Sequence, residues 1–300
     1  MLPNFLIVGA QKSGTTALAY YLSQHPEIYM SPVKEPGFFA FEGQSPNFSG
    51  PEDHQSFRLV TTDLNQYQQL FTGVRSEKAV GEASTWYLCH PDAPNRIRHY
   101  IPDVKLIAIL RNPVDRAFSG YMHLVKQGRE PLASFKDALA QEEKRINAGW
   151  EYLWHYKQMG LYAKQIKRYK KEFEYSQLKI FLYEDLDNSP EKVLKEVFSF
   201  LEIENDFMPP VLSRHNISGV KKSKFVDSLL KNDNPFKSAL KPFLPTKFRQ
   251  ELADFVRVKN YRKYTCPRDV RTQLVKEFRD DILELQDLMQ RDLTGWLALN

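Results

Sequence analysis

Residues Asn4–Thr16, which read NFLIVGAQKSGTT, constrain the fold more than any other stretch of this chain. Phe5–Val8 form a short apolar run of strand-forming residues, and a helical pattern begins at Thr15. Gly9 and Gly14 enclose the turn between the two elements. Because the N-terminus of a helix offers unpaired N–H groups and a partial positive charge, this loop is suited to bind a phosphate.

The rest of the chain alternates predicted strands with predicted helices. Lys105–Leu110 is a clear buried strand, and Asn112 and Pro113 suit the cap and first residue of a helix that runs to about 127. Residues 29–43 predict a loop with a short extended piece, and the polar residues 43–62 predict a surface loop. Further strands are predicted near 79–85 and 179–183, and further helices near 15–24, 63–71, 91–100, 131–145, 151–173, 245–258 and 268–291, with one capped by Ser189 through 201. This order predicts an α/β fold, P-loop-like, with a mainly parallel sheet and helices on both faces.

The composition, with 42% hydrophobic and 26% charged residues, is that of a globular protein. We expect one domain over residues 1–300, in which residues 205–300 form a helical part that is harder to assign. The net charge of +5 fits an anionic ligand but is shared by many soluble enzymes. Cys89 and Cys266 lack metal spacing, so we expect free thiols and a cytoplasmic protein. We expect neither a signal peptide nor a membrane span, because the first apolar run is short and lacks a basic segment before it.

The opening loop departs from a nucleotide-binding P-loop in the place of its lysine. A Walker A loop has lysine directly after its second glycine and a hydroxyl that binds Mg²⁺. In this chain Thr15 follows Gly14, and the lysine is Lys12, two residues before that glycine. The amides and hydroxyls of residues 13–16 remain as donors, a set that can hold a phosphate or phosphosulfate without a metal. A simple glycine turn with a solvated lysine is the alternative.

A second candidate anion site lies in LRNPVDRAFSGY, after the strand that ends at Leu110. Arg111 stands at the carboxyl end of this strand, where open α/β sheets bind ligands, and its planar guanidinium suits a phosphate. Ser119, two turns into the next helix, could bond the same group. Taken alone, this stretch fits a capped helix with a paired arginine equally well. Two anion sites at two strand ends indicate a ligand with two separated phosphates.

These residues resemble those of the sulfotransferases that use 3′-phosphoadenosine 5′-phosphosulfate (PAPS). QKSGTT resembles the 5′-phosphosulfate loop of that family, and LRNPVDRAFSGY resembles its 3′-phosphate motif. The order of HPEIYMSPVKEPGFF, GEASTWYL, HPDAPNRI, GLYAKQIKRY and RDLTGW is similar to that in heparan sulfate and bacterial carbohydrate sulfotransferases. The resemblance covers most of residues 4–203. It implies in-line transfer of a sulfuryl group from PAPS to a hydroxyl or amine, with a carbohydrate or glycoconjugate as acceptor.

The resemblance also implies a role for each matching residue. Lys12 would stabilise the charge on the leaving phosphate, and Glu35 in KEPGFF would take the proton of the acceptor. Arg111 and Ser119 would hold the 3′-phosphate. The 5′-phosphosulfate would be held by Ser13, Gly14, Thr15 and Thr16, together with Lys12. The alternative for Glu35 is a loop carboxylate paired with Lys34.

The sequence departs from the heparan-type pattern at two places. Ala83 stands where those enzymes often have a lysine, which argues against a heparan-like acidic acceptor. Their C-terminal cofactor loop has two alternative counterparts here, GVKKSK (219–224), with Lys222 and Ser223, and YRKYTCP (261–267). The first is equally compatible with a solvated basic loop.

Two other functions stay open on the sequence. A P-loop kinase or NTPase would need Mg²⁺ and an acidic residue such as Glu184 or Asp185, but no lysine follows Gly14. An inactive nucleotide-binding module would need neither Lys12 nor Glu35.

The partners follow from the same residues. The seven histidines show no metal spacing, and we expect them to be structural or at the surface, with His90 as a reserve base. We expect a small-molecule or glycan acceptor, no nucleic-acid partner and no metal. The aromatic loop 37–41 and the pair Trp86 and Tyr87 could stack on a sugar ring or a lipid-linked glycan.

Overall fold

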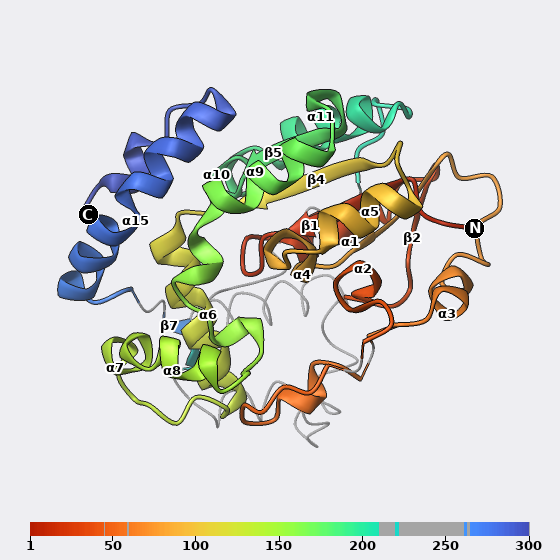
Figure 1. Cartoon of the computed structure of the whole chain (residues 1–300). Helices are drawn as coiled ribbons and strands as arrows, with labels where there is room; N and C mark the ends of the chain where they lie inside the picture. The colour runs from red at the N-terminus through yellow and green to blue at the C-terminus, as the bar shows by residue number, and fades with distance from the viewer. Residues whose placement is uncertain (45, 59, 210–219, 222–260, 263–264, 300) are drawn as a thin grey trace, which may run out of the picture. The chain divides into compact units, whose positions relative to one another are not determined.

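A computed structural model describes residues 1–44, 46–58, 60–209, 220–221, 261–262 and 265–299 of the chain (Figure 1). The chain forms two compact units, Met1–Ser213 with Cys266–Asn300, and Arg214–Thr265. Within the second unit, the structure describes an antiparallel pair of short strands, β6 (Val220–Lys221) and β7 (Tyr261–Arg262). The predicted helix at 245–258 and the candidate residues Lys222 and Ser223 lie outside the described residues.

The first unit is built on a five-stranded parallel sheet with the strand order β2-β3-β1-β4-β5. The strands are β1 (Phe5–Gly9), β2 (Ile28–Met30), β3 (Ala79–Ala83), β4 (Lys105–Leu110) and β5 (Leu178–Leu182). In the middle of the sheet, Leu6 of β1 pairs with Glu82 of β3 and Leu106 of β4. All of β1 is buried, as expected for a parallel strand covered on both faces. The predicted mainly parallel sheet is confirmed.

Alternate side chains of β1 point into two hydrophobic clusters, one on each face of the sheet. Phe5 and Ile7 pack in a cluster with residues of α1 (Thr15–Leu22), α10 (Tyr183–Asn188) and α11 (Pro190–Leu201). Leu6 and Val8 belong to the larger cluster on the other face. That cluster includes residues of α2 (Phe38–Phe41), α4 (Trp86–Cys89), α5 (Ala93–Tyr100), α6 (Pro113–Gln127), α9 (Tyr162–Glu172) and α15 (Arg268–Met289).

The helix boundaries follow local signals in the sequence, with one exception. Asn112 caps α6 as predicted, because its side-chain oxygen accepts from the amides of Val114 at 3.0 Å and Asp115 at 3.3 Å. Ser189 is the N-cap residue of α11 and Pro190 its first residue, as predicted, although the Ser189 side chain makes no capping hydrogen bond to any described residue. Shorter helices are α3 (Leu64–Gln69), α7 (Phe135–Ala140) and α8 (Glu142–Asn147), so the predicted helix at 131–145 divides in two.

The polar segment 43–62 is anchored at a buried residue, which the surface-loop prediction missed. Asp53 is fully buried and forms an ion pair with Arg129. Its carboxylate also accepts from the indole of Trp154 at 2.8 Å and the amide of Glu151 at 2.9 Å. These partners lie far along the chain, so the local composition of the segment could not predict them.

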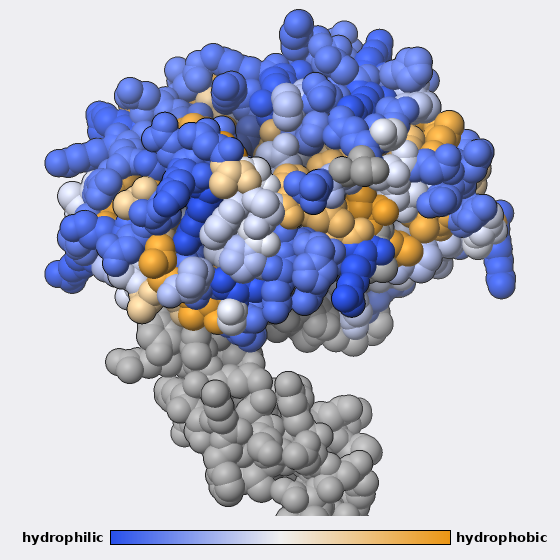
Figure 2. Space-filling model, turned by 60° about the horizontal axis from the view of Figure 1, so that its bottom comes forward, coloured by the Kyte–Doolittle hydropathy of each residue, from blue (hydrophilic) through white to orange (hydrophobic). Residues whose placement is uncertain are grey.

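The surface of the described residues is mainly polar. The face shown in Figure 2 is largely hydrophilic, with apolar side chains visible in its central part. Every helix among the described residues is too short or too polar to cross a bilayer. Cys89 and Cys266 are both free thiols, as predicted.

Candidate active site

The loop between β1 and α1 has a backbone that few residues adopt. Lys12 has a φ of 67° and Gly14 a φ of 94°, both in the left-handed region. A Cβ atom at Gly14 would lie 3.1 Å from the ring of Tyr183, so glycine meets both the backbone and the space requirement. Lys12 has no such freedom, and the strain of about 1–3 kcal/mol that such a residue stores is typical of functional loops.

The ammonium of Lys12 lies in a positive environment. Burial, followed by the charges of Lys34, Arg111, Lys126 and Arg116 in that order, lowers the pKa of Lys12 from 10.5 to about 8. These cations come from three parts of the chain, the loop after β2, the end of β4 and the helix α6. Since like charges disfavour the protonated amine, a bound anion would relieve the repulsion and restore the full charge of the lysine.

Arg111 lies beside Lys12, so the structure brings the two predicted anion sites together. Arg111 directly follows β4, which pairs with β1, and the carboxyl ends of parallel strands meet at one edge of a sheet. Its Nη1 donates to the carbonyl oxygen of Lys12 at 3.3 Å. Its guanidinium carbon lies 4.6 Å from the ring centre of Tyr183, the first residue of α10.

The remaining candidate donors lie on the elements that follow these strands. Ser13 is fully buried, Thr15 is nearly so, and Thr16 is exposed at the start of α1. Tyr162 of α9 is buried beside Ser13, and burial raises the pKa of this tyrosine to about 12. Ser119 is partly buried in α6, the helix that begins after Arg111, as the sequence predicts.

Glu35 is held by the residues that follow β3. Its backbone is left-handed, with a φ of 55°. Its carboxylate accepts from the amide of Thr85 at 2.6 Å and from the hydroxyl of Thr85 at 3.1 Å, and its own amide donates to the carbonyl of Ala83 at 3.2 Å. Burial raises the pKa of Glu35, whereas the Thr85 bonds and the charge of Lys34 lower it. Thr85, more than the neighbouring Lys34, is therefore the partner of this carboxylate.

His123 is a residue of this region that the sequence prediction missed. Burial, followed by the charges of Lys12, Lys126, Arg129 and Lys34, lowers the pKa of His123 to about 4, which favours the neutral imidazole. His123 follows Ser119 by one helical turn, which places both on one side of α6. That spacing was the available signal.

His90, the reserve candidate for the base, has its side chain engaged with Asp92 and Phe41. Its Nδ1 accepts from the amide of Asp92 at 3.3 Å, and its ring lies 5.7 Å from that of Phe41. Burial lowers the pKa of His90 to about 4.

The aromatic residues near Glu35 form core and not a sugar-stacking surface. Among them, Phe38, Phe39, Phe41, Trp86 and Tyr87 are all buried. Phe41 packs edge-on against Trp86 with ring centres 5.4 Å apart. The prediction that these rings stack on a sugar is therefore wrong. They belong to the hydrophobic core next to the loop of Glu35.

The carboxylates that a magnesium-dependent enzyme would need are engaged with the C-terminal residues. Glu184 accepts from the indole of Trp296 at 2.7 Å. Asp185 accepts from both terminal nitrogens of Arg291, at 2.6 and 2.7 Å. In the kinase alternative, both carboxylates would have to give up these partners to bind a metal.

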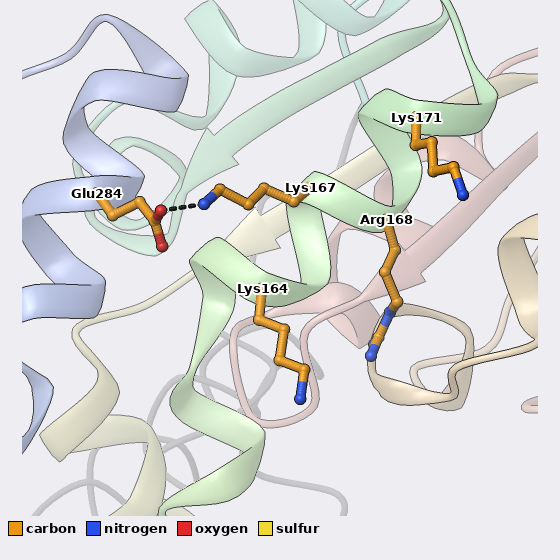
Figure 3. Close-up of a pocket in the computed structure, with 5 residues that line it drawn as sticks. All are labelled: Lys164, Lys167, Arg168, Lys171 and Glu284. Carbon is orange, nitrogen blue, oxygen red and sulfur yellow. Dashed lines mark hydrogen bonds and ion pairs between the residues drawn. The ribbon is translucent and has the colours of Figure 1, made fainter.

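A separate hollow of about 440 Å³ lies along α9 (Figure 3). Arg168 is anchored there by bonds to the carbonyls of Leu88 and Cys89, and Lys167 pairs with Glu284 of α15. The described residues that line the hollow are Lys164, Lys167, Arg168, Lys171 and Glu284. None of these residues belongs to the loop of Lys12 or was predicted to bind PAPS. The hollow is therefore distinct from that loop.

Comparison with known proteins supplies the family. Residues 3–207 match the sequence pattern described as "Sulfotransferase family". The chain belongs to this family. A structure of a sulfotransferase from Alicyclobacillus acidocaldarius superposes with a TM-score of 0.79 at 37% identity, and the match covers 99% of this chain and 100% of the other. The predicted family and α/β fold are thereby confirmed, and the family is one of transferase enzymes.

Two curated relatives of the family come from Mus musculus. Bifunctional heparan sulfate N-deacetylase/N-sulfotransferase 3 is 33% identical over 214 residues, which are 67% of this chain and 22% of the relative. Heparan sulfate glucosamine 3-O-sulfotransferase 3B1 is 28% identical over 202 residues, which are 67% of this chain and 46% of the relative. The chain thus spans less than half of the length of either relative.

Proposed function

We propose that this chain is a sulfotransferase that moves the sulfuryl group of PAPS in line to an acceptor hydroxyl or amine. The observation that supports this proposal best is the hydrogen bond between Arg111 and the carbonyl of Lys12, which places two cationic side chains at neighbouring strand ends. PAPS carries one phosphate at each side of its ribose, whereas the phosphates of ATP form a single chain. Two adjacent cationic sites match the first arrangement.

In this proposal each candidate residue has one task. Glu35 takes the proton of the acceptor while the acceptor oxygen or nitrogen attacks sulfur. The bond between sulfur and the bridging oxygen of the 5′-phosphate breaks, and its electron pair stays on that oxygen. Lys12 stabilises the charge that grows there. The 5′-phosphosulfate is held by Ser13, Gly14, Thr15 and Thr16, and the 3′-phosphate by Arg111 and Ser119.

These steps involve only the protein side chains and the two substrates, so we propose that the transfer needs no metal. The leaving product is 3′-phosphoadenosine 5′-phosphate (PAP). The two free thiols fit a reducing compartment, and we propose the cytoplasm.

We propose a carbohydrate or glycoconjugate as the acceptor. Both mouse relatives are named for action on heparan sulfate. Ala83 lacks the lysine of the heparan-type pattern, so the acceptor need not share the acidic character of heparan sulfate.

Calorimetric titration tests whether PAPS is the sulfuryl donor. The protein is titrated with PAP, with and without Mg²⁺, and with ATP. We expect PAP to bind equally well in both buffers and more tightly than Mg-ATP. Preference for Mg-ATP would instead support the kinase alternative. Incubation with PAPS and a panel of unsulfated oligosaccharides, followed by mass spectrometry, tests the acceptor by the mass of one added sulfuryl group.

A further inference from the structure

We infer that Glu82 is a positioning residue for Glu35, because it fixes the loop of Glu35 through Ser84 and Gly37. This inference rests on the proposed function, which assigns Glu35 the role of base. Glu82 lies near the carboxyl end of β3 and is 1% exposed. A carboxylate this deeply buried requires hydrogen-bond partners, and those partners lead to the loop.

The hydroxyl of Ser84 connects Glu82 to the loop. It donates to Oε2 of Glu82 at 2.8 Å and accepts from the amide of Gly37 at 2.9 Å. Because a serine hydroxyl has a single proton, donation to Glu82 leaves its lone pairs free for the amide. The other oxygen of Glu82 accepts from the hydroxyl of Tyr67 at 3.1 Å, which fixes the carboxylate in turn.

The loop that Ser84 holds is strained and needs such support. Glu35 and Gly37 have φ angles of 55° and 67°, so left-handed residues stand on both sides of Pro36. Strain of this kind persists only where surrounding contacts enforce it. Those contacts come from the three residues after Glu82. The carbonyl of Ala83 accepts from the amide of Glu35, and the hydroxyl of Ser84 accepts from the amide of Gly37. The amide and hydroxyl of Thr85 donate to the carboxylate of Glu35.

The two carboxylates also interact through charge. Burial raises the pKa of Glu82, the neighbouring hydroxyls of Tyr87, Ser84 and Tyr67 lower it, and the charge of Glu35 raises it, with a net pKa of about 7. An ionised Glu35 therefore favours the protonated form of Glu82. The hydrogen bonds of Glu82, and not its charge, carry the positioning role.

Amide hydrogen exchange of the protein without ligands tests the positioning role. The readout is the amide of Thr85, which bonds Glu35 and has no bond to Ser84 or Glu82 among the described contacts. We expect Glu82→Gln and Ser84→Ala each to speed its exchange at least about tenfold. Glu142→Gln is the matched control, because Glu142 is another buried carboxylate, bonded to the amides of Lys157 and Gln158. It should leave the amide of Thr85 unchanged.

Turnover of PAPS provides the second readout, measured as release of PAP with water or an oligosaccharide as acceptor. Glu82→Gln and Ser84→Ala should lower turnover about tenfold with little effect on PAP affinity. Unchanged exchange of Thr85 in either folded variant would overturn the positioning role. Glu35→Gln, measured in parallel, separates the two claims. Wild-type turnover in Glu35→Gln would refute Glu35 as the base while leaving the exchange result intact.

Discussion

The guanidinium of Arg111 lies over the ring of Tyr183, with 4.6 Å between the guanidinium carbon and the ring centre. The tyrosine follows β5 and the arginine follows β4, so two neighbouring strand ends build this stack. The same ring limits residue 14 to glycine. Tyr183 thus orients the cation and shapes the loop of Lys12.

Tyr183→Ala should weaken the binding of PAP. A cation stacked on an aromatic ring is stabilised by about 0.5–2 kcal/mol, so we expect an increase of about 2- to 30-fold in the dissociation constant. Calorimetric titration measures it. Tyr183→Phe keeps the ring and should bind normally, as should Tyr175→Ala, which removes an exposed ring near Lys170. Equal affinity of Tyr183→Ala and the wild type would show that the stack of Arg111 on Tyr183 does not contribute to the binding of PAP.

The affinity for PAP should fall in alkaline solution because of Lys12. Its pKa is lowered to about 8 in the free protein, and the bound phosphates would raise it. The complex would then bind more protons than the free protein above that pH. Affinity should be nearly constant between about pH 7 and 8, where the phosphates of PAP are ionised, and should decline by up to about tenfold per unit above pH 8.

Lys12→Ala provides the control for this profile. The variant should lose the alkaline decline that comes from Lys12, and its affinity for PAP at pH 7 should stay within about tenfold, or about 1.4 kcal/mol, of the wild type. Its turnover should drop much further, because the charge is needed most in the transition state. A variant with normal turnover would exclude Lys12 from catalysis.

The transfer rate should fall in acid because of Glu35. The base must be ionised, and burial raises the pKa of this carboxylate above its usual value, so the decline should begin at a higher pH than for a solvated glutamate. Glu35→Gln should lower turnover by about 10²–10⁴ with PAP affinity retained. A pH–rate profile of both proteins tests this. An acid limb that persists unchanged in the variant would point to another base.

The stability of the fold should decrease between about pH 4.5 and 7 because of Glu151. Burial and the charge of Asp53 raise the pKa of Glu151 to about 7, so the folded state binds the proton more tightly than the unfolded state. The resulting stabilisation is complete below pH 4.5 and is lost as the pH rises through 7. Glu151→Gln should remove about 1–3 kcal/mol of this change, as measured by urea unfolding.

A matched substitution at the surface checks that result. Glu143→Gln changes an exposed carboxylate of α8 and should leave the pH dependence of unfolding as in the wild type. If Glu151→Gln shows the same slope as the wild type, proton binding at Glu151 does not couple to folding.

Local signals predicted the elements that build the site. The apolar run Lys105–Leu110 and the cap Asn112 both appear where the sequence places them, since neither depends on distant residues. The helix α10 was not predicted, because it begins directly after β5 and no glycine or proline separates the two elements. The start of α11 after Ser189 was predicted, because serine followed by proline is a local signal for a helix start.

Long-range partners explain what the sequence could not predict. The neighbours of Lys12 come from β4, α6 and the loop of Lys34, and only the folded sheet brings them together. The partners of Asp53 likewise lie far away in the sequence. A polar residue in a loop reads as solvated until the chain that covers it is known.

The order β2-β3-β1-β4-β5 divides the site into two sides that meet at Lys12. In the proposed function, the residues after β4 and β5 recognise the nucleotide, and the loop after β2 with the end of β3 activates the acceptor. The two tasks would therefore be modular. Grafting residues 29–43 and 82–90 from a relative should transplant its acceptor preference while the recognition of the nucleotide stays that of this chain.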